Sequence, residues 1–425
     1  MSKSWSEPFE AWAKLTIPDG NDPLVLDARF NYDPEQGVVL DFMSMHEFPH
    51  TLCDLVAVIS GIGVVAIPEA TYRTRSMGLN HEYRYTAKAV LLLEVGLDSP
   101  MNGAVYACSS FPEGDSFLGH DPFKPTWIGD DEYTIHAKNI DLDVDWGMPA
   151  ARLSFETAFQ AKWDSSDYHR LRPTTSFTIE HDIEADWHMR IEELNRLRAM
   201  LDFLAFKPHG WSISHLHDAG ERRMIHISQQ ASTERPSSSK AASFFALRFK
   251  EIRQDFGGLM RYGFTESWRL SSFGEIAGLI RYPSRRFEDR LFSALRALEL
   301  RDGELRPTSI DDDLVTKLST FDAEWRLLGI PDIRAFRWLL RNTRNYLAHL
   351  TASQDEPPFN ENDRYRAYIQ SVAACRASLL RAGGMNSTAI EGYLNHVGNK
   401  CTDFHGPMDL SQYPPTPPWV KKVDP

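Results

Sequence analysis

Hydrophobic and polar residues alternate along the first part of the chain, over residues 8–190. Short segments rich in β-branched or aromatic residues are separated there by turn residues, as in PDGNDP and DPEQG. The segments with the clearest pattern are AWAKLTI (11–17), LVLDARFNY (24–32), GVVLDFMS (37–44), YRYTAKAVLLLEVGL (83–97) and ARLSFETAF (151–159). Because strands with one buried face alternate in this way, the region is predicted to form an antiparallel meander or sandwich.

The pattern becomes helical further along the chain. Apolar residues recur at helical spacing over 187–206, and two strand-like segments follow at 211–218 and 222–230. Residues 229–243 are Ser-rich and polar, as is typical of a linker or loop. Beyond them, apolar periodicity and cap residues predict helices near 244–262, 265–281, 284–300, 310–328, 331–350, 361–383 and 386–398.

These patterns predict an α+β protein in which a β-rich meander or sandwich domain precedes an all-α helical bundle. The predicted boundaries are a β-rich N-terminal domain at 1–228, which includes the helix at 187–206, a linker or loop at 229–243, a helical domain at 244–400 and a Pro-rich tail at 401–425.

The composition is typical of a soluble globular protein with more than one domain, since 42% of the 425 residues are hydrophobic and 25% are charged. Residues 1–12 contain no apolar signal segment, and the longest apolar run, at 55–67, is too short to span a bilayer. The cysteines stand far apart, at positions 53, 108, 375 and 401. We therefore expect a cytoplasmic protein with no membrane contact and with reduced, structural cysteines.

Charge is distributed unevenly along the chain. The net charge of −13 divides into −15 on residues 1–243 and +2 on residues 244–425. Within the second part, residues 331–350 hold four arginines and one aspartate. A local excess of positive charge of this kind attracts polyanions such as nucleic acids.

Two groups of histidines are candidates for metal ligands. HEFPH at 46–50 matches the H-E-x-x-H pattern of zinc proteases, but that pattern requires a helix, which Pro49 would break. HLHD at 215–218, with His209 and His226 nearby, places two imidazoles on one face of a strand. The alternative is that these are solvated or hydrogen-bonded histidines at a strand edge. We expect no resident metal ion.

A possible dinucleotide motif, GIGVVA at 61–66, has the spacing G-x-G-x-x-A. The segment that follows is β-branched and contains proline, whereas the motif requires the start of a helix at this place. A hairpin turn at Ser60-Gly61 explains the glycines better, so no cofactor is expected.

The decapeptide RNTRNYLAHL at 341–350 lies in the predicted helix 331–350. On an ideal helix the apolar residues of this segment fall within an arc of roughly 120°, which is its expected buried face. These residues are Phe336, Leu339, Leu340, Tyr346, Leu347 and Leu350.

Basic residues form a stripe on the other side of the same helix. Four arginines recur at spacings of three, four and three, namely Arg334, Arg337, Arg341 and Arg344. Asn345 lies beside this stripe and His349 along its far border, while Trp338 also projects on the polar arc. An exposed tryptophan there would favour a subunit interface or a stacked base.

A like-charged stripe has two interpretations. It costs a few tenths of a kcal/mol per i,i+4 pair, so its presence suggests a bound anion. The commoner situation is that such arginines are solvated or pair with carboxylates of neighbouring helices, and that the histidine is structural.

The segment Arg344-Asn345-Tyr346-Leu347-Ala348-His349 resembles the R-x4-6-H motif of the HEPN superfamily, which consists of small α-helical bundles. In that superfamily a polar residue usually follows the arginine, as Asn345 does here. RRFEDRLFSALRALE at 285–299 looks like the first HEPN helix. The wider layout, a β-rich part followed by LRAMLDFLAFKPHG and a helical domain, is similar to that of the ApeA-like antiphage defence proteins.

This resemblance implies a metal-independent endoribonuclease that stops translation in a phage-infected cell, with tRNA as a candidate substrate. It implies catalytic roles for Arg344, Asn345 and His349, and a homodimer in which two copies of the motif form one composite active site. The residues expected to bind substrate are Arg341, Arg337 and Trp338. The additional pair Arg341-Asn342 leaves open which arginine holds the phosphate.

In the acidic N-terminal domain, none of the candidate motifs HEFPH, HLHD and GIGVVA is expected to have a catalytic role. We hypothesise that it senses a phage-derived trigger or covers the basic stripe and restrains the nuclease. A second class of function also stays open. Many HEPN-type domains are not enzymes, so the protein could be a dimerisation or binding scaffold whose arginine and histidine only pair with carboxylates.

Overall fold

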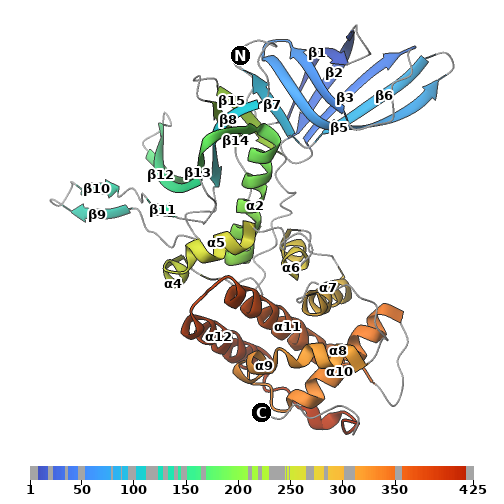
Figure 1. Cartoon of the computed structure of the whole chain (residues 1–425), viewed down its shortest axis with the longest axis vertical. Helices are drawn as coiled ribbons and strands as arrows, with labels where there is room; N and C mark the ends of the chain where they lie inside the picture. The colour runs from blue at the N-terminus through green and yellow to red at the C-terminus, as the bar shows by residue number, and fades with distance from the viewer. Residues whose placement is uncertain are drawn as a thin grey trace. The chain divides into compact units, whose positions relative to one another are not determined.

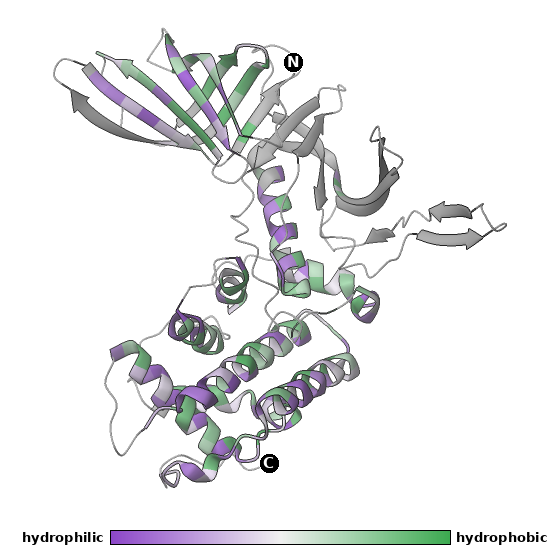
Figure 2. Ribbon diagram, turned by 180° about the vertical axis from the view of Figure 1, so that it is seen from behind, coloured by the Kyte–Doolittle hydropathy of each residue, from purple (hydrophilic) through white to green (hydrophobic). Residues whose placement is uncertain are grey.

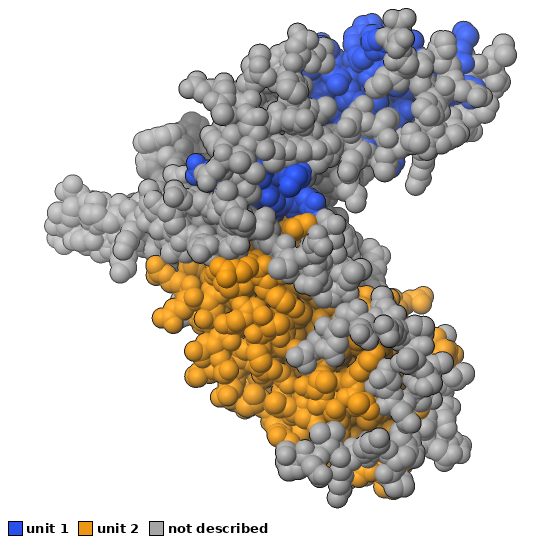
Figure 3. All heavy atoms as spheres, in the orientation of Figure 1, with its two compact units in different colours: residues 1–195, 209–236 blue, residues 196–208, 237–425 orange. Residues whose placement is uncertain are grey.

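The computed structural model describes residues 8–17, 23–33, 37–45, 53–77, 80–87, 89–93, 102–111, 123–127, 133–137, 142–144, 151–163, 169–208, 213–218, 223–228, 245, 247, 249–264, 272–281, 286–300, 312–349 and 357–417. The chain forms two compact units (Figure 3). The first, the sheet unit, comprises residues 1–195 and 209–236, and the second, the helical unit, comprises residues 196–208 and 237–425. An α+β protein with a β-rich part before a helical part is therefore confirmed.

The sheet unit is built from antiparallel strands. They are β1 (Phe9–Ile17), β2 (Leu24–Asp33), β3 (Gly37–Ser44), β4 (Cys53–Ile59), β5 (Gly63–Met77), β6 (Asn80–Ala87), β7 (Ala89–Leu93), β8 (Asn102–Phe111), β9 (Phe123–Trp127), β10 (Tyr133–Ala137), β11 (Leu142–Val144), β12 (Ala151–Trp163), β13 (His169–Asp186), β14 (Ile213–Asp218) and β15 (Arg223–Ser228). Thirteen of these strands form one sheet in the order β11-β12-β13-β8-β14-β15-β7-β5-β4-β1-β2-β3-β6, while β9 pairs with β10.

Six strands of this sheet form a closed circuit of pairings, because β5 is long enough to have two sets of partners. Its first part pairs with β4, from Gly63 to Ala70, and its second part pairs with β6, from Thr71 to Met77. Since β4, β1, β2, β3 and β6 also pair in that order, the circuit is complete. Purple and green bands mark the alternation of polar and apolar residues along these strands (Figure 2).

The alternation in sequence gives these strands one buried and one solvent-facing side. Leu15, Phe30 and Leu40 are fully buried in the core between the strands. On the outer side, Lys14 on β1 forms an ion pair of 2.6 Å with its cross-strand neighbour Asp27 on β2. The period of two that predicted the strands therefore also decides which residues fill the core.

The glycines of GIGVVA lie in the turn between β4 and β5. Gly61 and Gly63 have φ angles of 76° and 124°, which residues other than glycine rarely adopt. The Ile62 amide donates to the Ile59 carbonyl. The predicted hairpin turn is confirmed, and the segment does not begin a helix. The HEFPH segment lies outside the described residues, as do the side chains of the histidines at 209, 215, 217 and 226.

The predicted helix at 187–206 is confirmed as α2 (Trp187–Ala205), but the boundary between the two units falls inside it. Residues 196–208 belong to the helical unit, whereas the sequence had placed all of this helix with the strands. Phe203 packs on Phe273, with ring centroids 4.9 Å apart, and Asp202 accepts a hydrogen bond of 2.5 Å from Arg281. These contacts join the second half of α2 to residues that are distant in sequence.

The helical unit contains α4 (Phe249–Ile252), α5 (Phe256–Phe264), α6 (Ser272–Arg281), α7 (Phe287–Glu299), α8 (Asp312–Ser319), α9 (Asp322–Leu327), α10 (Ile333–His349), α11 (Glu361–Ala382), α12 (Ser387–His405) and the 3-10 helix η2 (Leu410–Gln412) (Figure 1). The single helix predicted at 310–328 is two helices, because the chain turns at Thr320-Phe321. The last helix continues past its predicted end at 398, so the first residues of the predicted tail are helical. No helix in the described part of the chain has the length and hydrophobicity needed to cross a membrane.

Arg376, in the middle of α11, is completely buried, and its hydrogen bonds in the described residues go to oxygen atoms that are not carboxylates. It donates to the carbonyls of Phe203 (2.5 Å) and Leu204 (3.2 Å), at the end of α2, to the Phe245 carbonyl, and to the Tyr393 hydroxyl (2.8 Å). The last carbonyls of a helix lack partners within the helix and carry partial negative charge. They therefore take the place of a counter-ion.

Aromatic rings surround the same guanidinium. Its central carbon lies 5.2 Å from the ring centroid of Phe203, 5.0 Å from that of Phe206 and 5.3 Å from that of Tyr393. Burial lowers the pKa of Arg376 below its usual value, which the Tyr393 hydroxyl partly opposes. Arg376 thus joins α11, α12 and the end of α2 at one buried point.

Candidate active site

Helix α10 carries the candidate motif, and both the end of the preceding helix and its own start are marked in the sequence. Gly329 has a φ of 75° after α9, and the Asp332 carboxylate accepts a hydrogen bond of 3.0 Å from the Ala335 amide. Phe336, Leu339 and Leu340 are fully buried, so this part of the predicted apolar face is confirmed. Of the remaining residues predicted for this face, Tyr346 and Leu347 are only half-buried, and Leu350 lies outside the described residues.

The prediction of an exposed basic stripe with an exposed Trp338 is wrong for the middle of the helix. The exposed fractions are 3% for Arg337, 4% for Arg341 and 1% for Trp338. Their burial leaves these three residues, which the sequence suggested as substrate-binding, almost no surface to offer a ligand. Arg334 is partly buried and donates to the Pro417 carbonyl.

The physical reason is that α10 is packed on more than one side, since α7, α8 and α9 all contact it. The segment before α11 lies along it, since the Phe359 amide donates to the Thr343 hydroxyl (2.9 Å) and the Asn342 amide donates to the Pro357 carbonyl (3.3 Å). Arg341 donates to the Asn342 side chain at 3.1 Å. A helical-wheel projection of one segment contains no information about such a covering element.

Arg337 instead faces a carboxylate inside the unit. Its Nε lies 3.7 Å from Asp322 Oδ1 on α9. Burial lowers the pKa of Arg337 and raises that of Asp322, while the attraction between the two charges opposes both shifts. This arginine therefore fits the structural interpretation of the stripe.

Arg344 differs from Arg337 and Arg341 because part of its side chain reaches solvent. The side chain is 29% exposed, and its Nε donates to Glu299 Oε1 at 2.8 Å, at the end of α7. One Nη lies 3.5 Å from the Asn345 side-chain oxygen. The ion pair with Glu299 holds the guanidinium through Nε, while Nη1 lies on the side of Asn345.

His349 is exposed at the last position of α10. It lies one turn after Asn345, so these two side chains share a face of the helix, whereas Arg344 lies about 140° around the helix axis from His349. The structure thus brings Arg344 and Asn345 together, whereas within one chain His349 lies at the same end of the helix but well around its axis from Arg344.

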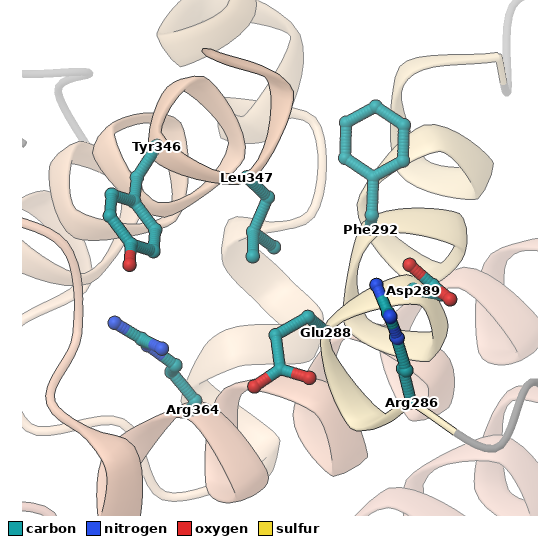
Figure 4. Close-up of a pocket in the computed structure, with 7 residues that line it drawn as sticks. All are labelled: Arg286, Glu288, Asp289, Phe292, Tyr346, Leu347 and Arg364. Atoms are coloured by element: carbon teal, nitrogen blue, oxygen red, sulfur yellow. The ribbon is translucent and has the colours of Figure 1, made fainter. Parts of the chain in front are cut away.

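A pocket of about 460 Å³ lies beside the motif, between α7, α10 and α11 (Figure 4). It is lined by Arg286, the residue just before α7, by Glu288, Asp289 and Phe292 of α7, by Tyr346 and Leu347 of α10, and by Arg364 of α11. The Arg364 guanidinium stacks over the Tyr346 ring, 4.9 Å from its centroid, and donates to the Phe359 carbonyl at 2.9 Å.

The sequence indicated neither this pocket nor the role of Glu299. Both depend on the packing of α7 against α10, and the residues involved lie more than one helix apart in the chain. The pattern of RRFEDRLFSALRALE predicts the helix that carries Glu299, but it does not indicate that this helix packs on Arg344.

Among the residues whose side chains are described, no group of three His, Cys, Asp or Glu side chains lies close enough together to hold a metal ion. The site offers instead a partly exposed guanidinium and an exposed imidazole at one end of a helix. These groups can bind an anion and transfer a proton.

Comparisons with protein-family models, with curated proteins and with solved structures found no match to this chain.

Proposed function

We propose that the protein is a ribonuclease that cleaves RNA without a metal ion, through Arg344 and His349. The observation that carries the proposal is the contrast along α10, where Arg337 and Arg341 are buried while Arg344 keeps 29% of its side chain exposed and His349 is exposed. This exposure favours Arg344 over Arg341 as the phosphate ligand. The resemblance of Arg344-Asn345-x-x-x-His349 to the HEPN motif supports the same residues.

The reaction uses a nucleophile that RNA carries itself. The 2′-oxygen attacks phosphorus, a base removes its proton, the bond from phosphorus to the 5′-oxygen breaks, and an acid protonates that oxygen. The products are a 2′,3′-cyclic phosphate and a 5′-hydroxyl. Arg344 donates to the non-bridging oxygens as charge develops on them, and a neutral His349 accepts the proton of the 2′-hydroxyl.

The second proton transfer requires a second group, because one imidazole cannot lie on both sides of the phosphate in one turnover. In this proposal a homodimer supplies it, with the His349 of another copy as the acid. Asn345, one turn before His349 and next to Arg344, orients either group.

The biological setting follows from the ApeA-like resemblance. We place the enzyme in the cytoplasm of a bacterium as part of an abortive-infection system, with tRNA as the candidate substrate. The charge of −15 on residues 1–243 fits a sheet unit that restrains the nuclease or binds a phage-derived trigger, since it would repel RNA.

A different class of function, a non-catalytic dimerisation or binding scaffold, is favoured by one observation. Arg344 already has a carboxylate partner in Glu299, as a purely structural arginine would. In that case the substitution Arg344→Ala would affect stability and assembly alone.

The experiment that tests the proposal is cleavage of total tRNA and of a single-stranded RNA by the full-length protein in EDTA. We expect cleavage that leaves 2′,3′-cyclic phosphate ends, and no cleavage at a site where a single 2′-deoxynucleotide replaces the ribonucleotide. A requirement for Mg²⁺, products with 3′-hydroxyl ends, or no cleavage of either RNA would count against the proposal.

Glu299 is expected to act on the reaction through Arg344. We predict that Glu299→Ala lowers the cleavage rate about tenfold, because the guanidinium loses the contact that orients it. Glu299→Gln keeps an oxygen acceptor for Arg344 Nε and should retain most of the activity. The matched control is Glu275→Ala, which breaks the 3.1 Å ion pair with Arg296 and should leave the rate unchanged. Equal rates for all three variants would show that Glu299 has no such role.

A further inference from the structure

The pocket beside the motif is lined by two kinds of residue. Phe292, Tyr346 and Leu347 are aromatic or aliphatic, while Arg286 and Arg364 bring positive charge and Glu288 and Asp289 bring negative charge. In Figure 4 the Glu288 carboxylate lies between the two arginines, below Leu347. A volume of about 460 Å³ is within the range of roughly 300–1,000 Å³ that is usual for small-molecule sites.

The pocket adjoins the motif along α10. Leu347 lies three residues after Arg344, and His349 lies three residues after Tyr346, so each motif residue is the neighbour of a pocket residue on the helix surface. Side chains at this spacing have Cβ atoms about 5–6 Å apart. The pocket and the motif are therefore close enough for one nucleotide to contact both.

We propose that this pocket binds the base next to the scissile phosphate and that it selects guanine. The inference rests on the proposed ribonuclease function and deepens it by naming the base. Guanine presents two adjacent N–H donors, N1–H and the 2-amino group, which match the two oxygens of one carboxylate, here Glu288. Its O6 and N7 accept from arginine, here Arg286 or Arg364, and its ring packs on Phe292 and Leu347, since Arg364 already stacks over the Tyr346 ring.

The other bases fit the same groups less well. Adenine and cytosine place a ring nitrogen lone pair next to their amino group, and this lone pair would face the second oxygen of the carboxylate. Uracil has one N–H donor between two carbonyl oxygens, both of which a carboxylate repels. A site that offers hydrogen bonds to a given base rejects a base that leaves them unmade.

Binding of mononucleotides to the full-length protein tests the pocket without any requirement for cleavage. We expect guanosine 5′-monophosphate to bind more tightly than adenosine 5′-monophosphate in isothermal titration calorimetry. Glu288→Gln should weaken binding of the guanine nucleotide about 10- to 100-fold and leave binding of the adenine nucleotide nearly unchanged. Glu288 is exposed in the first turn of α7, so this substitution is compatible with folding, which a thermal melt verifies.

The matched control is Glu391→Gln, the same change at an exposed position of α12, and it should alter neither affinity. Equal affinity for the two nucleotides, or no effect of Glu288→Gln, would overturn the proposal. Mapping of cleavage sites separates this inference from the function on which it rests. Cleavage without preference for guanine would overturn the assignment of the pocket alone. Selective binding of the guanine nucleotide without any cleavage would overturn the proposed ribonuclease function and support the pocket as a guanine site.

Discussion

Replacement of His349 by alanine is expected to lower the rate of RNA cleavage by a factor of about 10² to 10⁴, the usual contribution of a general acid or base. His349 lies exposed at the end of α10, so its removal leaves no cavity and should not change the melting temperature. Arg344→Ala should lower the rate by a similar factor, since the developing charge on phosphorus loses its cation. This variant should also lose up to about 1 kcal/mol of unfolding free energy, because its ion pair with Glu299 is partly exposed.

The measurement is the initial rate of cleavage of one RNA substrate in EDTA, together with a thermal melt and the molecular mass in solution. His396→Ala removes another exposed histidine of the helical unit and should leave the rate unchanged. Arg296→Ala breaks a comparable ion pair, with Glu275, and serves as the control for Arg344→Ala. Wild-type rates in both motif variants would show that neither Arg344 nor His349 takes part in catalysis.

Replacement of Arg376 by alanine is expected to cost about 2–5 kcal/mol of unfolding free energy, the usual range for truncation of a large buried side chain. The substitution leaves the carbonyls of Phe203 and Leu204 buried without these donors and opens a cavity between the rings of Phe203, Phe206 and Tyr393. Lysine has one ammonium group in place of a planar fork and cannot reach all of these acceptors, so Arg376→Lys should lose part of the same amount.

Urea denaturation of the full-length protein, followed by the helical signal in circular dichroism, measures this loss. Arg253→Ala changes an exposed arginine in the turn between α4 and α5, and it should alter stability by no more than about 0.5 kcal/mol. A loss below 1 kcal/mol for Arg376→Ala would show that the buried guanidinium contributes little net stability.

Many elements of this protein follow from local patterns, although the helices predicted at 244–262 and 310–328 are each divided into two. The helix at 187–206 and the helix that carries the motif at 331–350 were predicted to within a few residues, because an apolar stripe at helical spacing reports directly on one buried face. The strands at 11–17, 24–32 and 37–44 were found for the corresponding reason, with a period of two.

The errors concern contacts between distant segments. Trp338 and Arg341 were placed on a solvent-facing arc, but both are buried, because α7, α8 and α9 and the segment before α11 all pack on this helix. The closed circuit of strands depends on one long strand that has different partners at its two ends, and the pocket depends on three helices. None of these pairings leaves a periodic signal in the segments that form it. The roles of Arg344 and His349 in cleavage stay predictions.

The helical unit uses two separate stretches of the chain, and this has a consequence for its synthesis. Phe203 and the arginine that binds its carbonyl are 173 residues apart in sequence. At about 5–20 residues per second, a ribosome takes on the order of 10–35 s to make the chain between them. During this interval the end of α2 exists without Arg376. Its apolar residues Leu197, Leu201 and Leu204 are fully buried in the folded protein but cannot yet make all of those contacts. The nascent helical unit can therefore complete its folding only after α11 and α12 have left the ribosome.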